Sequence, residues 1–218
     1  KAEIEEVKKE LEARRDEIIQ LKAETEKKQA NLEGKREQQE KLKYQIDNEK
    51  EAAEKALAEE ERTSQELAKK IREIQAKLNK NKPKSKYTGG TFTWPTPGYE
   101  YVTSDYKMRL HPLLKVKKMH TGIDIRAPKG AKVVAGGEGT VSYAGWFGAY
   151  GNAVMIEHGG NITTLYAHLS AFTVKEGDTV EKGDQIGKVG TSGLSTGYHL
   201  HFEVRVSGDH VNPWNYLK

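Results

Sequence analysis

The chain of 218 residues contains no cysteine and no long hydrophobic run. Without cysteine there is no disulfide, no thiolate metal site and no cysteine nucleophile, so any bound metal must be held by histidine, aspartate or glutamate. No stretch of about 18 apolar residues is present, so the sequence predicts no membrane-spanning helix. The first residue is lysine rather than methionine, and we therefore expect a fragment or the mature form of a longer protein.

The chain also lacks a strong charge of either sign, because its formal net charge is only +4. Acidic and basic residues are interspersed, whereas nucleic-acid-binding proteins usually gather basic residues on one face. The observed pattern is typical of a solvated surface. We therefore expect no nucleic acid among the partners.

Proline is absent before Pro83, and Gly34 is the only glycine in that stretch. About half of residues 1–86 are charged, and Glu, Lys, Ala and Gln dominate, which is the composition of a long helix. Apolar residues recur mostly at spacings of three and four, as in a coiled-coil seam. These residues are Ile4, Val7, Leu11, Ile18, Leu21, Leu32, Leu42, Ile46, Leu67, Ile71, Ile74 and Leu78. We therefore predict a coiled coil over residues 1–80.

Two arrangements of residues 1–80 are compatible with this pattern. One is a single helix about 120 Å long at 1.5 Å per residue, and the other is a helical hairpin or a break near Gly34. Polar residues interrupt the seam in its middle, so an unpaired helix would be only marginally stable. A second copy, a membrane protein or other partner, or the rest of the chain would then cover the apolar stripe. The alternative is a solvated spacer helix.

A linker is expected at residues 81–91, because Pro83 cannot continue a helix and Gly89-Gly90 follows it. From Phe92 the sequence changes to short β-branched and aromatic runs broken by glycine, which is typical of an all-β domain over residues 92–218. Strands are expected at Lys132–Ala135, Gly139–Ala144, Ala153–Glu157, Ile162–Ala167, Asp178–Val180, Gln185–Val189 and His199–Val206. The predicted fold class is thus a long helix, or helical hairpin, followed by an antiparallel β domain.

The last of these strands carries two histidines and a glutamate at alternate positions. Side chains alternate faces along a strand, so His199, His201 and Glu203 share one face, while the opposite face is apolar. Two imidazoles and a carboxylate side by side are costly to pack without a metal or solvent. The face is therefore a candidate metal site, with an exposed strand as the alternative, and Glu203 is either an orienter of a ligand imidazole or a surface carboxylate.

A second candidate lies in His120-Thr121-Gly122-Ile123-Asp124. On an extended chain His120 and Asp124 face the same way, and Gly122 places no side chain between them. We interpret this gap as space for an ion. The segment is a weak signal alone, but together with His199 and His201 it supplies the nitrogen and oxygen ligands that suit zinc.

The other histidines have less distinctive settings. Taken alone, His168, in Thr164–Ser170, is compatible with a satisfied edge histidine. His158 precedes a Gly-Gly-Asn turn and is expected to be structural, and His111 and His210 are expected to be structural or peripheral.

Residues from about 92 to 218 resemble the lysostaphin/LytM family of zinc endopeptidases. The matching elements occur in the family's order, and among them are Arg109-Leu110-His111-Pro112, His120–Ile125, Tyr150-Gly151-Asn152, Thr164–Leu169 and Ser195–Glu203. This resemblance implies that His120, Asp124 and His201 bind zinc, and that His168 and His199 are catalytic without binding the metal in the resting enzyme.

The resemblance also implies a substrate and a location. Family members cut peptide cross-links of bacterial peptidoglycan, either glycine-rich or containing D-amino acids, so an extracytoplasmic protein of the periplasm or cell wall is expected, with a membrane association through a partner or through preceding sequence. We expect the Gly145–Gly151 and Gly193–Gly197 loops to form a groove with Tyr150 and Tyr198. Because a coiled coil precedes the domain, the chain is also similar to EnvC-like division factors, and the alternative function is a non-catalytic activator of a cell-wall amidase.

Overall fold

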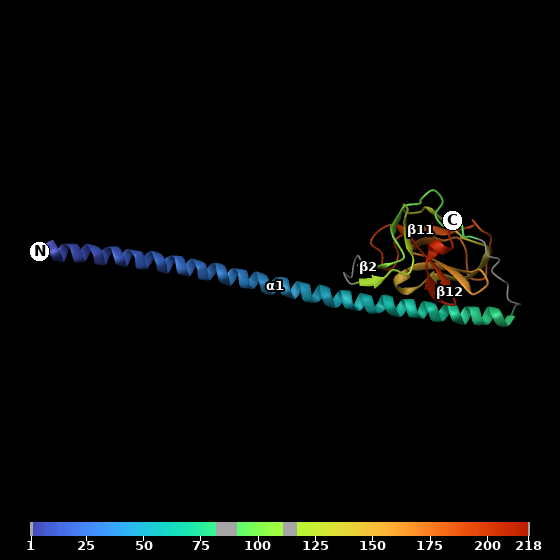
Figure 1. Cartoon of the computed structure of the whole chain (residues 1–218), viewed down its shortest axis with the longest axis horizontal. Coiled ribbons are helices and arrows are strands. Elements are labelled where there is room, and N and C mark those ends of the chain that lie inside the picture. Colours follow the sequence, from blue (N-terminus) through green and yellow to red (C-terminus); the bar gives the residue numbers. More distant parts are fainter. Residues whose placement is uncertain (1, 82–90, 111–116, 218) are drawn as a thin grey trace. The chain divides into compact units, whose positions relative to one another are not determined.

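The computed structural model describes residues 2–81, 91–110 and 117–217 (Figure 1). A single helix, α1, spans Ala2–Asn81 and passes through Gly34 without interruption. The alternative of a hairpin or a break near Gly34 is therefore wrong. One glycine costs only about 1 kcal/mol in a helix interior, and strong helix formers surround this one. Most of the expected linker lies outside the described residues.

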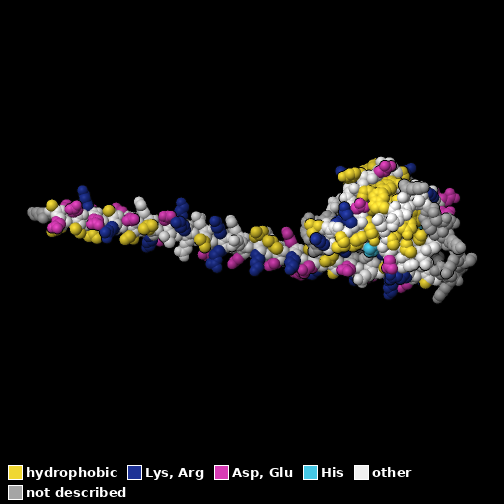
Figure 2. All heavy atoms as spheres, in the orientation of Figure 1, with side chains coloured by type: hydrophobic (Ala, Val, Ile, Leu, Met, Phe, Trp, Pro, Cys, Tyr) yellow, Lys and Arg dark blue, Asp and Glu magenta, His cyan; other side chains and the backbone are white. Residues whose placement is uncertain are grey.

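The chain consists of two compact units, Lys1–Ala52 and Ala53–Lys218. The first unit consists of α1 residues, and its apolar side chains remain more than half exposed, visible as yellow spheres among charged side chains (Figure 2). These side chains are Ile4, Val7, Leu11, Ile18, Leu21, Leu32, Leu42 and Ile46. Among the described residues, no helix combines the length and apolar character needed to cross a bilayer.

The second unit contains the last turns of α1 and the β domain. Its strands are β1 (Val102–Ser104), β2 (Met108–Leu110), β3 (Lys117–Met119), β4 (Ile123–Arg126), β5 (Lys132–Val134), β6 (Gly139–Trp146), β7 (Asn152–Glu157), β8 (Ile162–Ala167), β9 (Leu169–Phe172), β10 (Thr179–Val180), β11 (Gln185–Val189), β12 (His199–Val206) and β13 (Asp209–Val211). The short 3₁₀ helices η1 (Gly148–Tyr150) and η2 (Pro213–Asn215) complete the unit. All seven strands expected from the sequence are present, with small shifts at their ends.

The largest sheet has the strand order β1-β4-β12-β8-β7-β6-β10, with β13 pairing to β12. A smaller sheet has the order β5-β11-β9, and β2 pairs with β3. The ladders between these strands are antiparallel. The fold is thus the expected long helix followed by an antiparallel β domain.

The main core lies between the large sheet and the β5-β11-β9 sheet. The apolar face of β12 contributes Leu200, Phe202 and Val204, which are fully buried there with Ile123 and Ile125 of β4. Burying one such side chain stabilises the fold by about 1.5–3 kcal/mol. The period-two pattern of β12 therefore fixes which of its faces points into the core, and His201 and Glu203 must lie on the other face.

The opposite face of the large sheet is covered in part by α1. Leu67 and Ile71 are buried in a second apolar cluster with Met155 and Leu165. Residue Leu165 of β8 is the direct partner of Glu203 in the neighbouring β12. Because directly paired residues of an antiparallel ladder share a face, α1 packs on the same face of the sheet that carries His199 and His201.

Candidate metal centre and catalytic site

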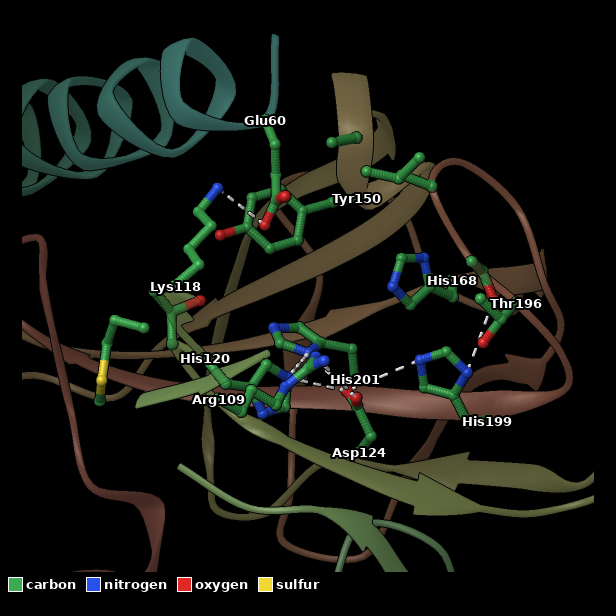
Figure 3. Close-up of a pocket in the computed structure, with 15 residues that line it drawn as sticks. Glu60, Arg109, Lys118, His120, Asp124, Tyr150, His168, Thr196, His199 and His201 are labelled. Carbon is green, nitrogen blue, oxygen red and sulfur yellow. Dashed lines mark hydrogen bonds and ion pairs between the residues drawn. The ribbon is translucent and has the colours of Figure 1, made fainter. Parts of the chain in front are cut away.

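Three side chains converge at the centre of the candidate site (Figure 3). His201 Nδ1 lies 2.8 Å from Asp124 Oδ1 and 3.2 Å from His120 Nε2, and His120 Nε2 lies 3.1 Å from the same aspartate oxygen. Zinc bonds of about 2.0–2.1 Å in a tetrahedral site imply ligand atoms roughly 3.3 Å apart. The triangle of donor atoms therefore has about the size that a zinc ion requires.

The pairing of β4 with β12 creates this convergence. Asp124 and His201 are direct partners across the ladder, and His120 lies just before β4. Gly122 permits the close approach, because a Cβ atom there would meet the Phe202 carbonyl oxygen at 2.3 Å. The sequence-based interpretation of Gly122 as space for an ion is therefore wrong, since strand β12 fills that space.

Each histidine of the triangle is held from behind by an oxygen acceptor. The second ring nitrogen of His120, Nδ1, lies 2.8 Å from the Asp105 carbonyl oxygen, and Nε2 of His201 lies 3.0 Å from Glu203 Oε1. When these nitrogens carry the protons, the lone pairs of the other nitrogens face Asp124. Such outer hydrogen bonds fix the tautomer and orientation of metal-binding histidines.

The electrostatics of the centre favour a cation between the three side chains. Burial alone would raise the pKa of Asp124, but hydrogen bonds with His120 and His201 and the charges of both rings hold it well below its usual range. Burial lowers the pKa of His201, but hydrogen bonds to Asp124 and Glu203 and their charges outweigh burial and raise it to about 9. Without metal, His201 therefore keeps its second proton and a positive charge. A bound metal ion can replace that charge.

The donor set fits zinc by its chemistry. Two imidazole nitrogens and one carboxylate oxygen are ligands that zinc accepts, and three protein ligands are typical of catalytic rather than structural sites. His120 and His201 are both buried. The structure thus brings together the three residues expected to bind the metal.

A buried network supports His201 from the far side. Glu203 accepts hydrogen bonds from Tyr150 Oη at 2.9 Å and from Thr121 Oγ1, and its other oxygen accepts from Arg205 Nε at 2.6 Å. Burial would raise the pKa of Glu203, but the Arg205 charge and the His201 hydrogen bond lower it well below its usual range. Of the two interpretations of Glu203, the structure therefore supports the orienting carboxylate. Arg205 is an addition that the sequence did not indicate, and Tyr150, expected only as part of the groove, also holds Glu203.

The two other expected residues, His168 and His199, lie side by side with ring centroids 4.8 Å apart. His168 Nδ1 lies 2.7 Å from the Ser192 carbonyl oxygen, and His199 Nδ1 lies 2.9 Å from that of Gly197. Burial, together with neighbouring histidines, lowers the pKa of His168 to about 3, and burial lowers that of His199. Both rings are therefore neutral at pH 7, with Nδ1 donating to a carbonyl and Nε2 unprotonated, and His199 Nε2 lies 3.6 Å from Asp124 Oδ1.

His168 adopts an unusual backbone conformation, with a φ of +60° between β8 and β9. Residues other than glycine rarely adopt the left-handed backbone conformation, because it costs of order 1–3 kcal/mol. Such residues are concentrated at functional sites. Its amide donates to the Tyr150 carbonyl oxygen at 3.0 Å. The backbone is thus held in a strained geometry that directs His168 into the pocket.

The pocket around these residues is lined by both loops expected to form a groove, through Ala149, Tyr150, Leu194, Ser195 and Thr196. Tyr198, although half exposed, is not part of the lining. Three charged residues that were not expected in the pocket also line it, and these are Glu60 of α1, Arg109 of β2 and Lys118 of β3. In Figure 3, Glu60 and Lys118 lie at the opposite end of the pocket from His168 and His199.

The remaining described histidines are structural, as expected. His158 lies between the Glu138 carbonyl oxygen at 2.6 Å and Thr164 Oγ1 at 2.8 Å. His210 contacts the Tyr106 hydroxyl at 3.0 Å. Neither residue lines the pocket. His111 lies outside the described residues.

The β domain matches proteins of known families. The model of peptidase family M23 matches residues 118–213. The chain is 50% identical over 115 residues to the DD-carboxypeptidase/endopeptidase Mpg of Neisseria meningitidis, which covers 53% of this chain and 26% of that protein. It is 35% identical over 128 residues to the murein hydrolase activator NlpD of Escherichia coli, covering 58% of this chain and 31% of NlpD. The chain thus spans about a quarter to a third of the length of these relatives.

Solved structures agree with this match. A zinc-containing peptidase from Vibrio cholerae has a TM-score of 0.53 and 36% identity, covering 56% of this chain and 39% of that one. The catalytic domain of the prophage-encoded M23 protein EnpA from Enterococcus faecalis has a TM-score of 0.51 and 35% identity, covering 58% of this chain and 97% of that one. From the family match, the identity to a nearly complete M23 catalytic domain and the shared antiparallel fold, it follows that this chain belongs to peptidase family M23.

Proposed function

We propose that the chain is a zinc-dependent endopeptidase that hydrolyses peptide cross-links of bacterial peptidoglycan, outside the cytoplasm. The observation that carries the proposal is the convergence of His120, Asp124 and His201 within 4.8 Å beside two neutral imidazoles. A purely structural metal site would have no use for two neutral histidines, one buried and one partly buried, that do not belong to the ligand triangle.

In this proposal His120, Asp124 and His201 hold the metal. Zinc supplies a Lewis acid and lowers the pKa of water towards neutrality when bound in such a site. The Nε2 atom of His168 or His199 accepts the proton of the attacking water, and the resulting imidazolium donates it to the leaving amine. The same rings can donate hydrogen bonds to the oxyanion that develops at the scissile carbonyl. Glu203, with Arg205 behind it, keeps the His201 ring oriented.

The names of the relatives support a substrate with D-amino acids. Mpg is a DD-carboxypeptidase/endopeptidase, and it is 50% identical to this chain over 115 residues. Between glycine-rich and D-amino-acid cross-links, the proposal therefore favours the second. Neither substrate places bulky L side chains near the scissile bond.

A second candidate function is that of a non-catalytic activator of another wall hydrolase, with residues 1–80 binding a membrane-protein or coiled-coil partner. The similarity to the activator NlpD favours it. The complete set of three ligand residues and two histidines favours the enzyme. An activator requires neither zinc nor wall cleavage, so the two functions differ in measurable properties.

The test is zinc content and lysis of purified cell wall, measured on the same preparations. We expect one zinc per chain and cleavage by the unaltered protein. The Asp124→Ala, His201→Ala double variant is expected to lose both. His168→Ala and His199→Ala should retain zinc and lose about 10²-fold or more in rate, whereas His210→Ala, outside the pocket, serves as a matched control. Stoichiometric zinc in the double variant would refute the ligand assignment, and wall that stays intact with zinc-loaded protein would favour the activator.

The proposal includes control of the site by α1. Glu60 lines the pocket, and Leu67 and Ile71 are buried against the face of the sheet that carries the site. Thr63 lies against Gly148, where an added Cβ atom would be 2.6 Å from the threonine hydroxyl. In this position α1 borders the pocket through Glu60. A partner that binds α1 better in the released arrangement would open it.

A further inference from the structure

The wall of the pocket contains two cations placed directly opposite each other. Arg109 in β2 and Lys118 in β3 are paired residues of an antiparallel ladder, so their side chains point to the same side. Both side chains are only 20% exposed. Like charges that face each other across a ladder destabilise it, and partial burial increases the repulsion. Such a pair is stable only with anions close by.

The chain itself supplies two carboxylates to this pair. Asp124 Oδ2 lies 3.6 Å from Arg109 Nη2, which is longer than a hydrogen bond. Glu60 Oε1 lies 3.0 Å from Lys118 Nζ, and Figure 3 shows Glu60 extending from α1 towards this lysine. Within the described part of the chain, the buried Arg109 Nε makes no hydrogen bond. The arginine therefore has unused donor capacity at the pocket wall.

In an active molecule, neither Asp124 nor Glu60 fully neutralises the charges of Arg109 and Lys118. Asp124 is a member of the metal triangle, so its charge is shared with the metal. Glu60 belongs to α1, which leaves the pocket when the helix is released. Arg109 and Lys118 would then face the open pocket without a dedicated anion. Arginine binds carboxylates well, because its planar fork can donate two parallel hydrogen bonds.

We propose that Arg109 and Lys118 form a carboxylate-binding subsite that selects peptides with a free carboxylate next to the scissile amide, and that Glu60 occupies this subsite in the closed molecule. This inference rests on the proposed peptidase function. A residue of extended peptide spans about 3.5 Å. Arg109 Nη2 lies 3.6 Å from Oδ2 of Asp124, one of the three proposed metal ligands. The carboxylate must therefore belong to a residue that adjoins the reacting bond.

The proposal separates two classes of cross-link. A bridge of glycines has no carboxylate beside an internal scissile bond. A D-amino acid whose amino group forms the scissile amide can carry a carboxylate there. This carboxylate is either the C-terminus of the peptide or the second carboxylate of a cross-linking diamino acid. The subsite thus explains a preference by charge, independent of side-chain size.

The first experiment measures binding without catalysis. N-acetyl-D-alanine and its uncharged amide are titrated by NMR into the full chain, zinc-loaded and metal-free. We expect the carboxylate to bind on the order of 10- to 100-fold more tightly than the amide. Arg109→Gln should reduce this ratio to near one, and Glu60→Gln should tighten carboxylate binding by removing the internal competitor. Lys132→Gln, an exposed charge on β5, is the matched control. Equal binding of acid and amide would overturn the subsite, and unchanged binding in Glu60→Gln would overturn its occupation by Glu60.

The second experiment measures cleavage with three matched peptides. One ends with a carboxylate directly after the scissile bond, one carries it on a cross-linking diamino acid, and one is the amide of the second. Comparison of kcat/KM between the first two peptides shows which carboxylate the subsite prefers, the C-terminal one or that of the diamino acid. Arg109→Gln should lower kcat/KM on the preferred peptide 10- to 100-fold, mainly through KM. An equal loss on all peptides accompanied by loss of zinc would instead make Arg109 a positioning residue of Asp124. If the zinc-loaded protein cleaves none of them but still prefers the acid in binding, the peptidase function fails and the subsite stands.

Discussion

The two parts of α1 have similar sequences and very different surroundings. Apolar residues recur at helical spacing in both parts. Before residue 53 they are more than half exposed, whereas Leu67 and Ile71 are 0% and 1% exposed. Helical periodicity therefore predicts an apolar stripe, but it does not show whether the stripe is covered or what covers it. The same pattern is compatible with a partner in one part and with the chain's own β domain in the other.

The second part differs because it has several polar and apolar contacts at once. Gln75 Nε2 lies 3.2 Å from Glu157 Oε2 and 3.2 Å from Thr163 Oγ1. Arg72 bonds to the Asp209 carboxylate at 2.7 Å. These contacts join residues that are far apart in the sequence, so local spacing cannot reveal them.

The largest expected effect comes from removing the apolar contacts of the second part. Leu67→Ala with Ile71→Ala should lower the free energy of unfolding by about 2–5 kcal/mol, because it leaves cavities against Met155 and Leu165. Released from the sheet, α1 should also allow wall cleavage to rise on the order of 10-fold. Urea unfolding followed by tryptophan fluorescence and a wall-lysis rate measure both.

The matched control for this experiment lies in the first part of the same helix. Leu32→Ala with Leu42→Ala removes equally large but exposed side chains. These substitutions should stay within about 0.5 kcal/mol of the unaltered protein in the same unfolding assay. Similar losses in both pairs would show that the two parts of α1 do not differ as described.

The next effect concerns what covers the first part. If a second copy covers it as a coiled coil, Ile18→Asp should weaken self-association on the order of 10²-fold, because it buries an unpaired charge in the seam. Sedimentation at several protein concentrations measures this, and the exposed Glu17→Gln is the control. A chain that stays monomeric at all concentrations would exclude a second copy and leave a different partner as the cover.

A smaller effect is expected at Gln75, which is 6% exposed. Gln75→Ala should cost about 1–3 kcal/mol, because the partly buried Glu157 and the buried Thr163 lose a shared hydrogen-bond partner. The exposed Gln45→Ala should have almost no effect. Thermal unfolding of both variants tests the difference, and equal midpoints would contradict a docked second part.

The smallest effect is expected from Arg72→Ala. The Arg72 and Asp209 side chains are 54% and 74% exposed, and exposed ion pairs contribute about 0–1 kcal/mol. Arg14→Ala, which removes the exposed pair with Glu10, should cost a similarly small amount. A loss above about 2 kcal/mol for Arg72 alone would mean that ion pairing, and not apolar burial, holds the second part of α1.

Much of the β domain could be predicted because its local patterns are strong. Alternation in His199–Val206 assigned Leu200 and Phe202 to the core and His201 to the opposite face, as the structure has it. Short strands such as β2 and β3 were missed, because three residues carry too little periodicity to detect. Arg109 and Lys118 were missed as a pocket wall for the same reason, since only the pairing of these two strands brings them together.

The residues of the candidate site were predicted through motif spacing and family resemblance. The groups that hold their rings in place were not predicted. His120, Asp124, His168, His199 and His201 were all named from the sequence, and the structure brings them together. The expected roles of metal binding and catalysis stay predictions. The carbonyls of Asp105 and Ser192 that hold two of the rings carry no sequence signal, because any residue has a carbonyl group.

The sequence by itself determined the helical character of residues 1–80, the alternating faces of the strands and the set of chemically competent side chains, because each depends on residues close together in the chain. Only the tertiary structure decided that the end of α1 packs on the face of the sheet that carries the site, and that Glu60 lies beside Lys118 at the pocket wall. These outcomes depend on shape and charge complementarity between segments more than 50 residues apart. Spacing within either segment contains no information about such complementarity.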